Sequence, residues 1–187
     1  MDVRLRELRQ SDLEPMLEWM NDPETVKYLG NGFIRGRSAE SVRYEIELRL
    51  SGDVRGERYV IEDAETGEYL GQCDLLLPDD FARTVEVAVV IKKSVWGRGA
   101  AKKAMEKLLK RAFLELDYRR VYLLCIDKNL RALSLYEHLG FTREGVMRRH
   151  MLSGGEICDV VIMGMLREEY LALDGVCPPG EARKADI

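Results

Sequence analysis

The sequence lacks the features that mark several large classes of protein. Its 187 residues include only four cysteines, at 73, 125, 158 and 177, with no Cys-x-x-Cys pair, and only two histidines, so no zinc site is expected. No stretch free of charged residues exceeds seven, whereas a membrane-spanning helix needs about 20 apolar residues. The N-terminus alternates charged and apolar residues and has no apolar core of the kind that a secretion signal needs. We therefore expect a cytoplasmic protein that binds no metal and no membrane.

Several motifs that carry chemistry are absent as well. There is no Gly-x-x-x-x-Gly-Lys-Ser/Thr loop, and the pair Gly97-x-Gly99 lacks the third glycine of a dinucleotide-binding loop, which argues against nucleotide hydrolysis and dehydrogenation. No Gly-x-Ser-x-Gly or His-Glu-x-x-His occurs, so serine-hydrolase and zinc-protease activities are not expected. The net charge of −4, from 29 Lys and Arg against 33 Asp and Glu, argues against a general nucleic-acid-binding protein.

What the sequence does have is the composition of one globular domain. Apolar residues make up 46% of it, and a chain of this length buries roughly 70% of its extended surface on folding. No repeat or long linker divides the chain, and Pro178-Pro179-Gly180 ends regular structure near the C-terminus. We expect a single domain over residues 1–173 and a flexible tail over residues 174–187.

Hydrophobic periodicity predicts an α/β domain with a mixed sheet. Alternating or continuous apolar runs predict strands at 3–8, 59–62, 69–77, 84–91, 121–126 and 157–166, with a hairpin turn at 65–68. Apolar residues that share one helical face predict helices that begin at the capping box 11–14, at 38, at 99 and at 131, and that end near 21, 51, 112 and 139. Strands and helices alternate in the second half, as an α/β fold requires.

A glycine loop between a predicted strand and a predicted helix is the first candidate site. Residues 89–101 run from a buried strand through Gly97 and Gly99 into a helix start, where unpaired backbone amides and the helix dipole attract anions. Residues 92–111 carry eight basic side chains and one acidic one, a local charge of +7 in a protein of −4. Any one of these lysines, taken alone, fits a solvated helix face better than a ligand site, but the glycines and the charge excess together favour a polyphosphate ligand.

Three motifs resemble the GNAT superfamily of N-acetyltransferases over residues 3 to about 170. Residues 96–101, Trp-Gly-Arg-Gly-Ala-Ala, are similar to its acyl-CoA pyrophosphate loop, Gln/Arg-x-x-Gly-x-Gly/Ala, with Trp96 where Gln or Arg is usual. Residues 129–141, Asn-Leu-Arg-Ala-Leu-Ser-Leu-Tyr-Glu-His-Leu-Gly-Phe, resemble the family's Asn-x-x-Ala/Ser-x-x-Leu-Tyr-Glu-Lys-x-Gly-Phe. The tryptophan and the run Trp-Met-Asn-Asp-Pro-Glu at 19–24 resemble the branch that acetylates the N-termini of ribosomal proteins.

The resemblance implies the GNAT fold, a central mixed, mostly antiparallel sheet that is splayed between two strands and flanked by about four helices. It also implies acetyl-CoA as the cofactor. Amides of the strand at 89–91 should bind the pantetheine arm and amides at 97–102 the pyrophosphate, while Asn129 should bind near the thioester, although it also fits a helix N-cap. The cofactor-binding residues are thus expected to be Val89, Val90, Ile91, Trp96, Gly97, Arg98, Gly99, Ala100, Ala101, Lys102 and Asn129.

Two residues match the family's catalytic positions. Tyr136 matches the tyrosine that faces the cofactor sulfur, and a phenol of pKa about 10 is protonated at pH 7 and can donate to a leaving thiolate. Its alternative role is that of a buried core tyrosine. Glu86 matches a carboxylate that acts as general base, and desolvation in a cofactor groove would raise its pKa and strengthen it as a base. Its alternative role is that of a surface ion-pair partner.

The acceptor is less well defined. Residues 12–24 carry five acids and no base, which would suit a cationic amine, although acids at helix N-termini account for part of this pattern. Glu156 and Asp159, near the last strand, are further candidates for acceptor contacts. We expect acetyl transfer to a primary amine of a protein N-terminus or a small molecule. A polyamine, amino-sugar or aminoglycoside acetyltransferase and a non-catalytic acyl-CoA sensor are the alternatives; no nucleic-acid partner is expected, and a homodimer is left open.

Overall fold

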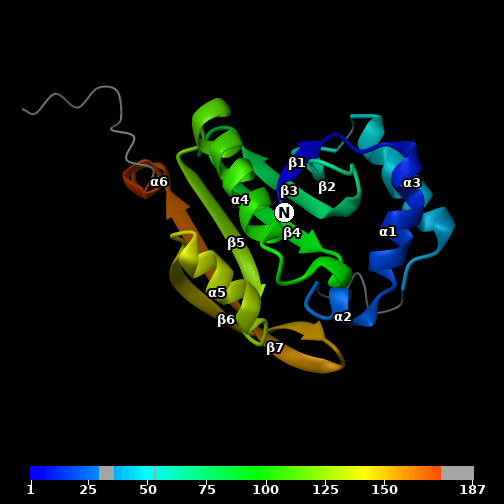
Figure 1. Ribbon diagram of the computed structural model, residues 1–187. Helices are drawn as coiled ribbons and strands as arrows, with labels where there is room; N and C mark the ends of the chain where they lie inside the picture. The colour runs from blue at the N-terminus through cyan, green and yellow to red at the C-terminus, as the bar shows by residue number, and fades with distance from the viewer. Residues whose placement is uncertain (30–35, 53, 174–187) are drawn as a thin grey trace, which may run out of the picture.

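The computed structural model describes residues 1–29, 36–52 and 54–173, which form a seven-stranded sheet with helices on both faces (Figure 1). The strands lie in the order β1-β2-β3-β4-β5-β7-β6. Their bounds are β1 Val3–Arg6, β2 Glu57–Asp63, β3 Tyr69–Asp79, β4 Thr84–Ile91, β5 Arg120–Ile126, β6 Thr142–Ser153 and β7 Glu156–Leu166. The predicted flexible tail at 174–187 lies outside the described residues.

Strands β4 and β5 run parallel and part soon after they meet. The other neighbouring strands of the described sheet are antiparallel. Residues 84–86 of β4 pair with residues 120–122 of β5, after which β4 continues only along β3 and β5 only along β7. Backbone groups of β4 on the side of β5 are therefore left without a strand partner beyond Glu86, and they need another one. The predicted splayed, mixed and mostly antiparallel sheet is confirmed.

Two hydrophobic cores hold the helices against opposite faces of the sheet. The described helices are α1 Leu13–Met20, α2 Pro23–Val26, α3 Ala39–Leu50, α4 Ala100–Lys110, α5 Leu130–His138 and α6 Arg167–Leu173. The core under α4, α5 and α6 includes Leu108, Leu133 and Ile61. The core under α1 and α3 includes Ile46 and Val60, and Val60 and Ile61 divide between the cores because alternate strand residues face opposite ways. Within the described residues, no helix is long and apolar enough to cross a membrane.

Strand β6 and the short helices α2 and α6 were not predicted. The four residues of α2 and the seven of α6 are too few to show a helical period. Strand β6 lies at the edge of the sheet with mostly exposed side chains, and its register with β7 shifts between Met147 and Met151. An exposed strand with a bulge has no regular alternation of apolar and polar residues, so periodicity could not reveal it.

The start of α1 differs from the prediction. A 3₁₀ turn occupies Gln10–Asp12, and α1 begins at Leu13, so Ser11 does not open the helix through a capping box. The carboxylate of Asp12 instead accepts hydrogen bonds from the backbone of Arg9, at 2.8 Å, and from the guanidinium of Arg6, at 2.7 Å. Asp12, through its local bond to Arg9 and its ion pair to Arg6 on β1, therefore takes the place of the expected Ser11 cap.

Candidate active site

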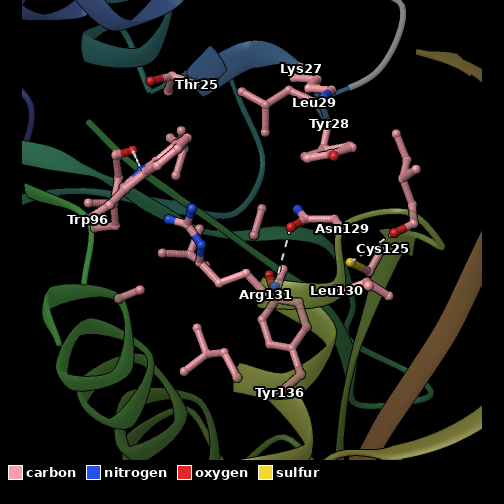
Figure 2. A pocket seen from close by; sticks show the side chains of 18 of the residues that line it. Thr25, Lys27, Tyr28, Leu29, Trp96, Cys125, Asn129, Leu130, Arg131 and Tyr136 are labelled. Atoms are coloured by element: carbon pink, nitrogen blue, oxygen red, sulfur yellow. Dashed lines mark hydrogen bonds between the residues drawn. The ribbon is translucent and has the colours of Figure 1, made fainter. Parts of the chain in front are cut away.

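A cavity of about 600 Å³ lies where β4 and β5 part (Figure 2). Four segments supply its walls: residues 24–29 in and after α2, residues 86–91 of β4, residues of the loop and helix start at 95–102, and residues from the end of β5 and the start of α5 between 124 and 136. The cavity follows from the early end of pairing between β4 and β5, because no other strand among the described residues fills the gap that opens there.

The loop between β4 and α4 offers unpaired amides to this cavity. Gly97 and Gly99 have φ values of 77° and 81°, which glycine adopts without strain. Gly99 is the N-cap of α4, and its carbonyl accepts from the amide of Lys103 at 3.2 Å, so the amides of residues 100–102 precede the first intrahelical bond. Nothing lies within 4 Å of where a Cβ would stand on either glycine. An anion can therefore reach amides that also lie at the positive end of the helix dipole, which fits the pyrophosphate of CoA.

Trp96 forms the wall of the cavity next to this loop. Its indole nitrogen donates to the carbonyl of Ile91 at 2.8 Å, which ties the ring to the end of β4. The guanidinium of Arg131, from α5, lies over the ring at 4.1 Å from its centre. Figure 2 shows the Arg131 side chain extending from the α5 side toward Trp96. The loop side and the α5 side of the cavity therefore meet at this pair.

Asn129 lies at the N-terminus of α5 and lines the same cavity. Its side-chain oxygen accepts from the amide of Ala132 at 3.3 Å, so the helix-capping role is present. The side-chain NH₂ group is not used by this cap. Asn129 can therefore cap α5 and still bind the cofactor near its thioester. The contact with the cofactor stays a prediction.

Tyr136, from the second turn of α5, reaches the cavity from below in Figure 2. The ring is buried and packs edge-on against Phe141, with centroids 5.9 Å apart. Its hydroxyl makes no hydrogen bond with any residue that the structure describes. Burial, and to a smaller extent the nearby Cys125, raise the pKa of Tyr136, so the phenol is protonated at neutral pH. The side chain can therefore donate a proton into the cavity.

Glu86 lies on β4 at the point where the strands separate, beside Tyr122 of β5. Its carboxylate is half-buried and lines the cavity. Burial raises the pKa of Glu86 above its ordinary value, which makes the carboxylate a stronger base. Glu86 and Tyr136 thus reach one cavity from two elements that are 50 residues apart in sequence.

Among the other predicted site residues, all but one line the cavity. Val89, Val90, Ile91, Gly97, Gly99, Ala100, Ala101 and Lys102 do so together with Trp96 and Asn129. The exception is Arg98, whose side chain is exposed and does not contribute to the wall. Their contacts with the cofactor stay predictions.

The acidic run at 12–24 does not form the expected rim. Asp12 is buried and ion-paired with Arg6, and Asp22 caps α2 by accepting from the amides of residues 24 and 25. Glu18 pairs with Lys92 at 3.2 Å. Only Glu24 of this run lines the cavity. Acids near helix starts are here used for structure, as the helix dipole favours.

Glu156 and Asp159, the other candidates for acceptor contacts, also lie outside the cavity wall. Glu156 pairs with Lys128, and the carboxylate of Asp159 accepts from the backbone amide of Arg149 at 2.7 Å. Both carboxylates are engaged in holding the β6–β7 region. Neither is therefore the first choice of base.

Sequence reasoning missed one whole wall of the cavity, and it also missed Arg131 and the residues at the end of β5, Leu124, Cys125 and Ile126. The missed wall is the turn after α2, which contains Lys27, Tyr28 and Leu29. The hydroxyl of Ser153 donates a hydrogen bond to the carbonyl of Lys27 in this turn. The motif at 19–24 pointed to this region but assigned no role to the residues after it. Arg131 stood within the motif at 129–141, and its charge beside the glycine loop was the available signal.

Comparison with known proteins agrees with this geometry. Residues 2–142 match the family described as acetyltransferase (GNAT) domain. The chain is 26% identical to the uncharacterised N-acetyltransferase p20 of Bacillus licheniformis, over 90% of this chain and 94% of that protein. It is 25% identical to spermidine N(1)-acetyltransferase of Escherichia coli K12, over 91% and 89% of the two chains.

Solved structures show the same relationship. The spermidine N-acetyltransferase of Vibrio cholerae, in complex with CoA and spermine, superposes with a TM-score of 0.83 at 26% identity, over 91% of this chain and 98% of that chain. The family match covers more than half of the sequence. The sheet also opens at a loop that fits the pyrophosphate of CoA. The chain belongs to the GNAT family and is an acetyl-CoA-dependent N-acetyltransferase.

Proposed function

We propose that this enzyme transfers the acetyl group directly to a primary amine of a small molecule or a protein N-terminus, with Glu86 as general base and Tyr136 as general acid. One observation carries the proposal. A half-buried carboxylate with a raised pKa and a buried, protonated phenol both line the cavity that the anion-binding loop enters. A proton acceptor and a proton donor around one reaction space support these two roles.

The base is needed because a protonated amine has no lone pair with which to attack. An alkyl amine of pKa about 10.4 costs about 4 to 5 kcal/mol to deprotonate at pH 7, whereas an α-amino group of pKa near 8 costs about 1.4 kcal/mol. Glu86 takes this proton, directly or through one water. The raised pKa of Glu86 lowers the cost of that transfer.

The acid is needed because a thiolate is released as the new bond forms. Bound acetyl-CoA supplies the acetyl thioester, whose carbon–sulfur bond breaks as the carbon–nitrogen bond forms. Tyr136 gives its proton to the departing sulfur, and the desolvation that raises the pKa of the phenol also raises that of a thiol in the same cavity. Solvent then restores the proton to Tyr136 and removes the one held by Glu86.

Direct transfer is favoured over an acylated enzyme by the state of the nearest thiol. Cys125 lines the cavity, but burial raises the pKa of its thiol to about 12. The thiolate is the nucleophilic form, and it is scarce at neutral pH when the pKa is so high. Cys125 therefore packs the wall rather than accepting the acetyl group.

Two acceptor classes have specific support. The names of the relatives support a polyamine such as spermidine, and Glu24 and Glu86 supply two acids within the cavity wall. Lys27 and Lys128 also line the cavity and favour an acceptor whose amine is followed by carbonyl or carboxylate oxygens, as a peptide N-terminus is. The motifs at 96 and 19–24, which resemble those of ribosomal-protein acetyltransferases, also support this second class.

An acceptor screen tests the proposed activity. Free thiol released from acetyl-CoA would be measured over polyamines, amino sugars and peptides with free N-termini. At least one primary amine should release thiol in a one-to-one ratio with acetylated product. Binding of acetyl-CoA without release by any amine would contradict the proposal and would instead support the sensor.

Replacing Gly99 by valine should weaken the binding of CoA at least about tenfold. A β-branched residue is strained at a φ of 81°, so the loop would shift and misplace the amides of α4. Isothermal calorimetry with CoA measures the change. Gly67→Val is the matched control, because Gly67 also has a positive φ, of 73°, and open space around it but lies in the β2–β3 turn. Equal affinity in the Gly99 variant and the parent would remove the loop from the site.

A further inference from the structure

The acid and the base of the proposed mechanism reach the cavity from opposite faces of the sheet. Val85 and Val87 belong to the core under α4 and α5, which also contains Tyr136. Glu86 lies between these two valines on β4 and therefore points to the other face, as does Val90, which packs against the core under α1 and α3. The anion-binding loop leads into α4 on the Tyr136 side. The amine that gives its proton to Glu86 is therefore expected on the face of α1 and α3.

Beside Glu86, this face carries three apolar side chains that belong to neither of the two hydrophobic cores. Tyr122 pairs with Glu86, and Leu124, two residues further along β5, points to the same side. Ile162 of β7 pairs with Leu124. Tyr122 and Ile162 are half-buried, whereas Leu124 is 39% exposed although it lines the cavity. Tyr122, Leu124 and Ile162 are called the apolar strip below.

The acids that lie near Glu86 on this face already have arginine partners. Asp74 of β3, which faces the same way, pairs with Arg58 at 3.1 Å. Glu144 of β6 pairs with Arg120 at the start of β5. Glu86 itself forms no ion pair with any residue that the structure describes. A single ammonium group therefore finds a free carboxylate here, whereas further ammonium groups would meet arginines.

Tyr28, in the turn after α2, continues the apolar surface beyond the strip. It packs against a small core that contains Ile126 and Val160, which form the next pair of residues on the same face. Figure 2 shows Tyr28 across the cavity from Tyr136. The other acid of the cavity wall, Glu24, has an exposed side chain on α2 and does not lie on the sheet. The surroundings of the proposed base thus combine one negative charge with an apolar surface.

We propose that the acceptor is a primary amine with one positive charge and an apolar body, whose ammonium group binds at Glu86 and whose body lies on the apolar strip. An apolar body removes the strip from water, which is favourable. A second ammonium group would lose its water on the strip without gaining a partner, which costs free energy. The inference rests on the proposed transfer with Glu86 as base, and it selects among the amines that this function leaves open.

Steady-state rates of thiol release with three amines test the proposal. Ethylamine and 2-phenylethylamine share the primary ammonium group and differ in the apolar ring, whereas spermidine adds further positive charges. The kcat/KM for 2-phenylethylamine should exceed that for each of the others at least about tenfold, the usual gain from burying one apolar side chain. An equal or higher value for ethylamine or spermidine would overturn the proposal and leave acetyl transfer intact. No thiol release with any amine would contradict the transfer itself, and this proposal with it.

Leu124→Gln tests the strip directly, because glutamine keeps the size of the side chain and removes its apolar character. It should lower kcat/KM for 2-phenylethylamine about fivefold or more, through a higher KM, and change that for ethylamine less than twofold. Leu48→Gln is the matched control: Leu48 is 37% exposed but lies on α3 outside the cavity wall, so both values should stay as in the parent. An equal loss for the two amines in Leu124→Gln, or no loss, would overturn the role given to the strip.

Peptides distinguish the two sources of such an amine. Two tetrapeptides that differ only in an N-terminal phenylalanine or glycine should differ in the same direction as the two monoamines. A higher kcat/KM for the phenylalanine peptide than for 2-phenylethylamine would identify a polypeptide N-terminus as the source, and the reverse a small molecule. In either case Leu124→Gln should reduce the preference for phenylalanine over glycine, and an unchanged preference would overturn the proposal.

Discussion

Tyr136→Phe is expected to lower kcat by about 10² to 10³ while the affinity for CoA stays unchanged, because the substitution removes only the proton donor. The ring remains to pack against Phe141, so the wall of the cavity is kept. The hydroxyl that is lost has no described hydrogen-bond partner whose loss would disturb the fold. Steady-state rates with a saturating amine, together with calorimetry for CoA, separate the two quantities.

Tyr118→Phe is the matched control for this prediction. Tyr118 lies beside the same core but outside the cavity, so the loss of its hydroxyl should leave kcat unchanged. If Tyr136→Phe turned over like the parent, Tyr136 would be a core residue of α5 and the acid would have to be sought elsewhere.

Glu86→Gln is expected to give the second large loss, and its pH dependence should identify the acceptor class. Glutamine keeps the size of the side chain and cannot take a proton. With an alkyl amine the rate near pH 7 should fall by about 10² or more and recover toward pH 10, where solvent deprotonates the amine. With an α-amino acceptor the deficit should be shallower, because about a tenth of that group is already neutral at pH 7.

The pH profile of the parent enzyme has a definite sign. Because burial raises the pKa of Glu86, the carboxylate should protonate, and activity should fall, at a higher pH than for an ordinary glutamate. Glu86→Gln should remove the loss of activity that protonation of this carboxylate causes, and leave only the pH dependence of the amine. Glu65→Gln, which removes an exposed carboxylate in the β2–β3 turn, should leave it in place. A variant at Glu86 with the rate and pH profile of the parent for every acceptor would return this residue to a structural role.

The elements that sequence could reveal are those whose burial imposes a period. Helix α4 buries Ala104, Met105 and Leu108 on one face, and β5 is apolar from Val121 to Ile126, so both could be predicted. Strand β6 is exposed and bulged, and the start of α1 depends on the Arg6–Asp12 ion pair. An ion pair between side chains six residues apart and an exposed edge strand leave no hydrophobic period in the sequence.

The site residues also divide into those that a local sequence pattern reveals and those that only the folded structure brings to the cavity. The glycine loop and the Tyr136 motif are local, so a short stretch of sequence identifies them. The turn after α2 reaches the cavity only through tertiary contacts such as the bond from Ser153 to Lys27. The sequence predicts an acidic rim at 12–24 because it shows where charges lie but not which side chains they contact. In the structure Arg6 pairs with Asp12, and Lys92 pairs with Glu18.

The central claim is that the amine receives the acetyl group directly within the cavity between β4 and β5. A single-turnover experiment tests this most directly, with protein in excess over acetyl-CoA labelled in its acetyl group and with the best acceptor from the screen. Intact-mass measurements would follow the label on the protein and on the amine. If transfer is direct, the label should pass to the amine at the rate at which thiol appears, with no acetylated protein at any time. Acetylated protein that forms and decays ahead of the product would contradict it.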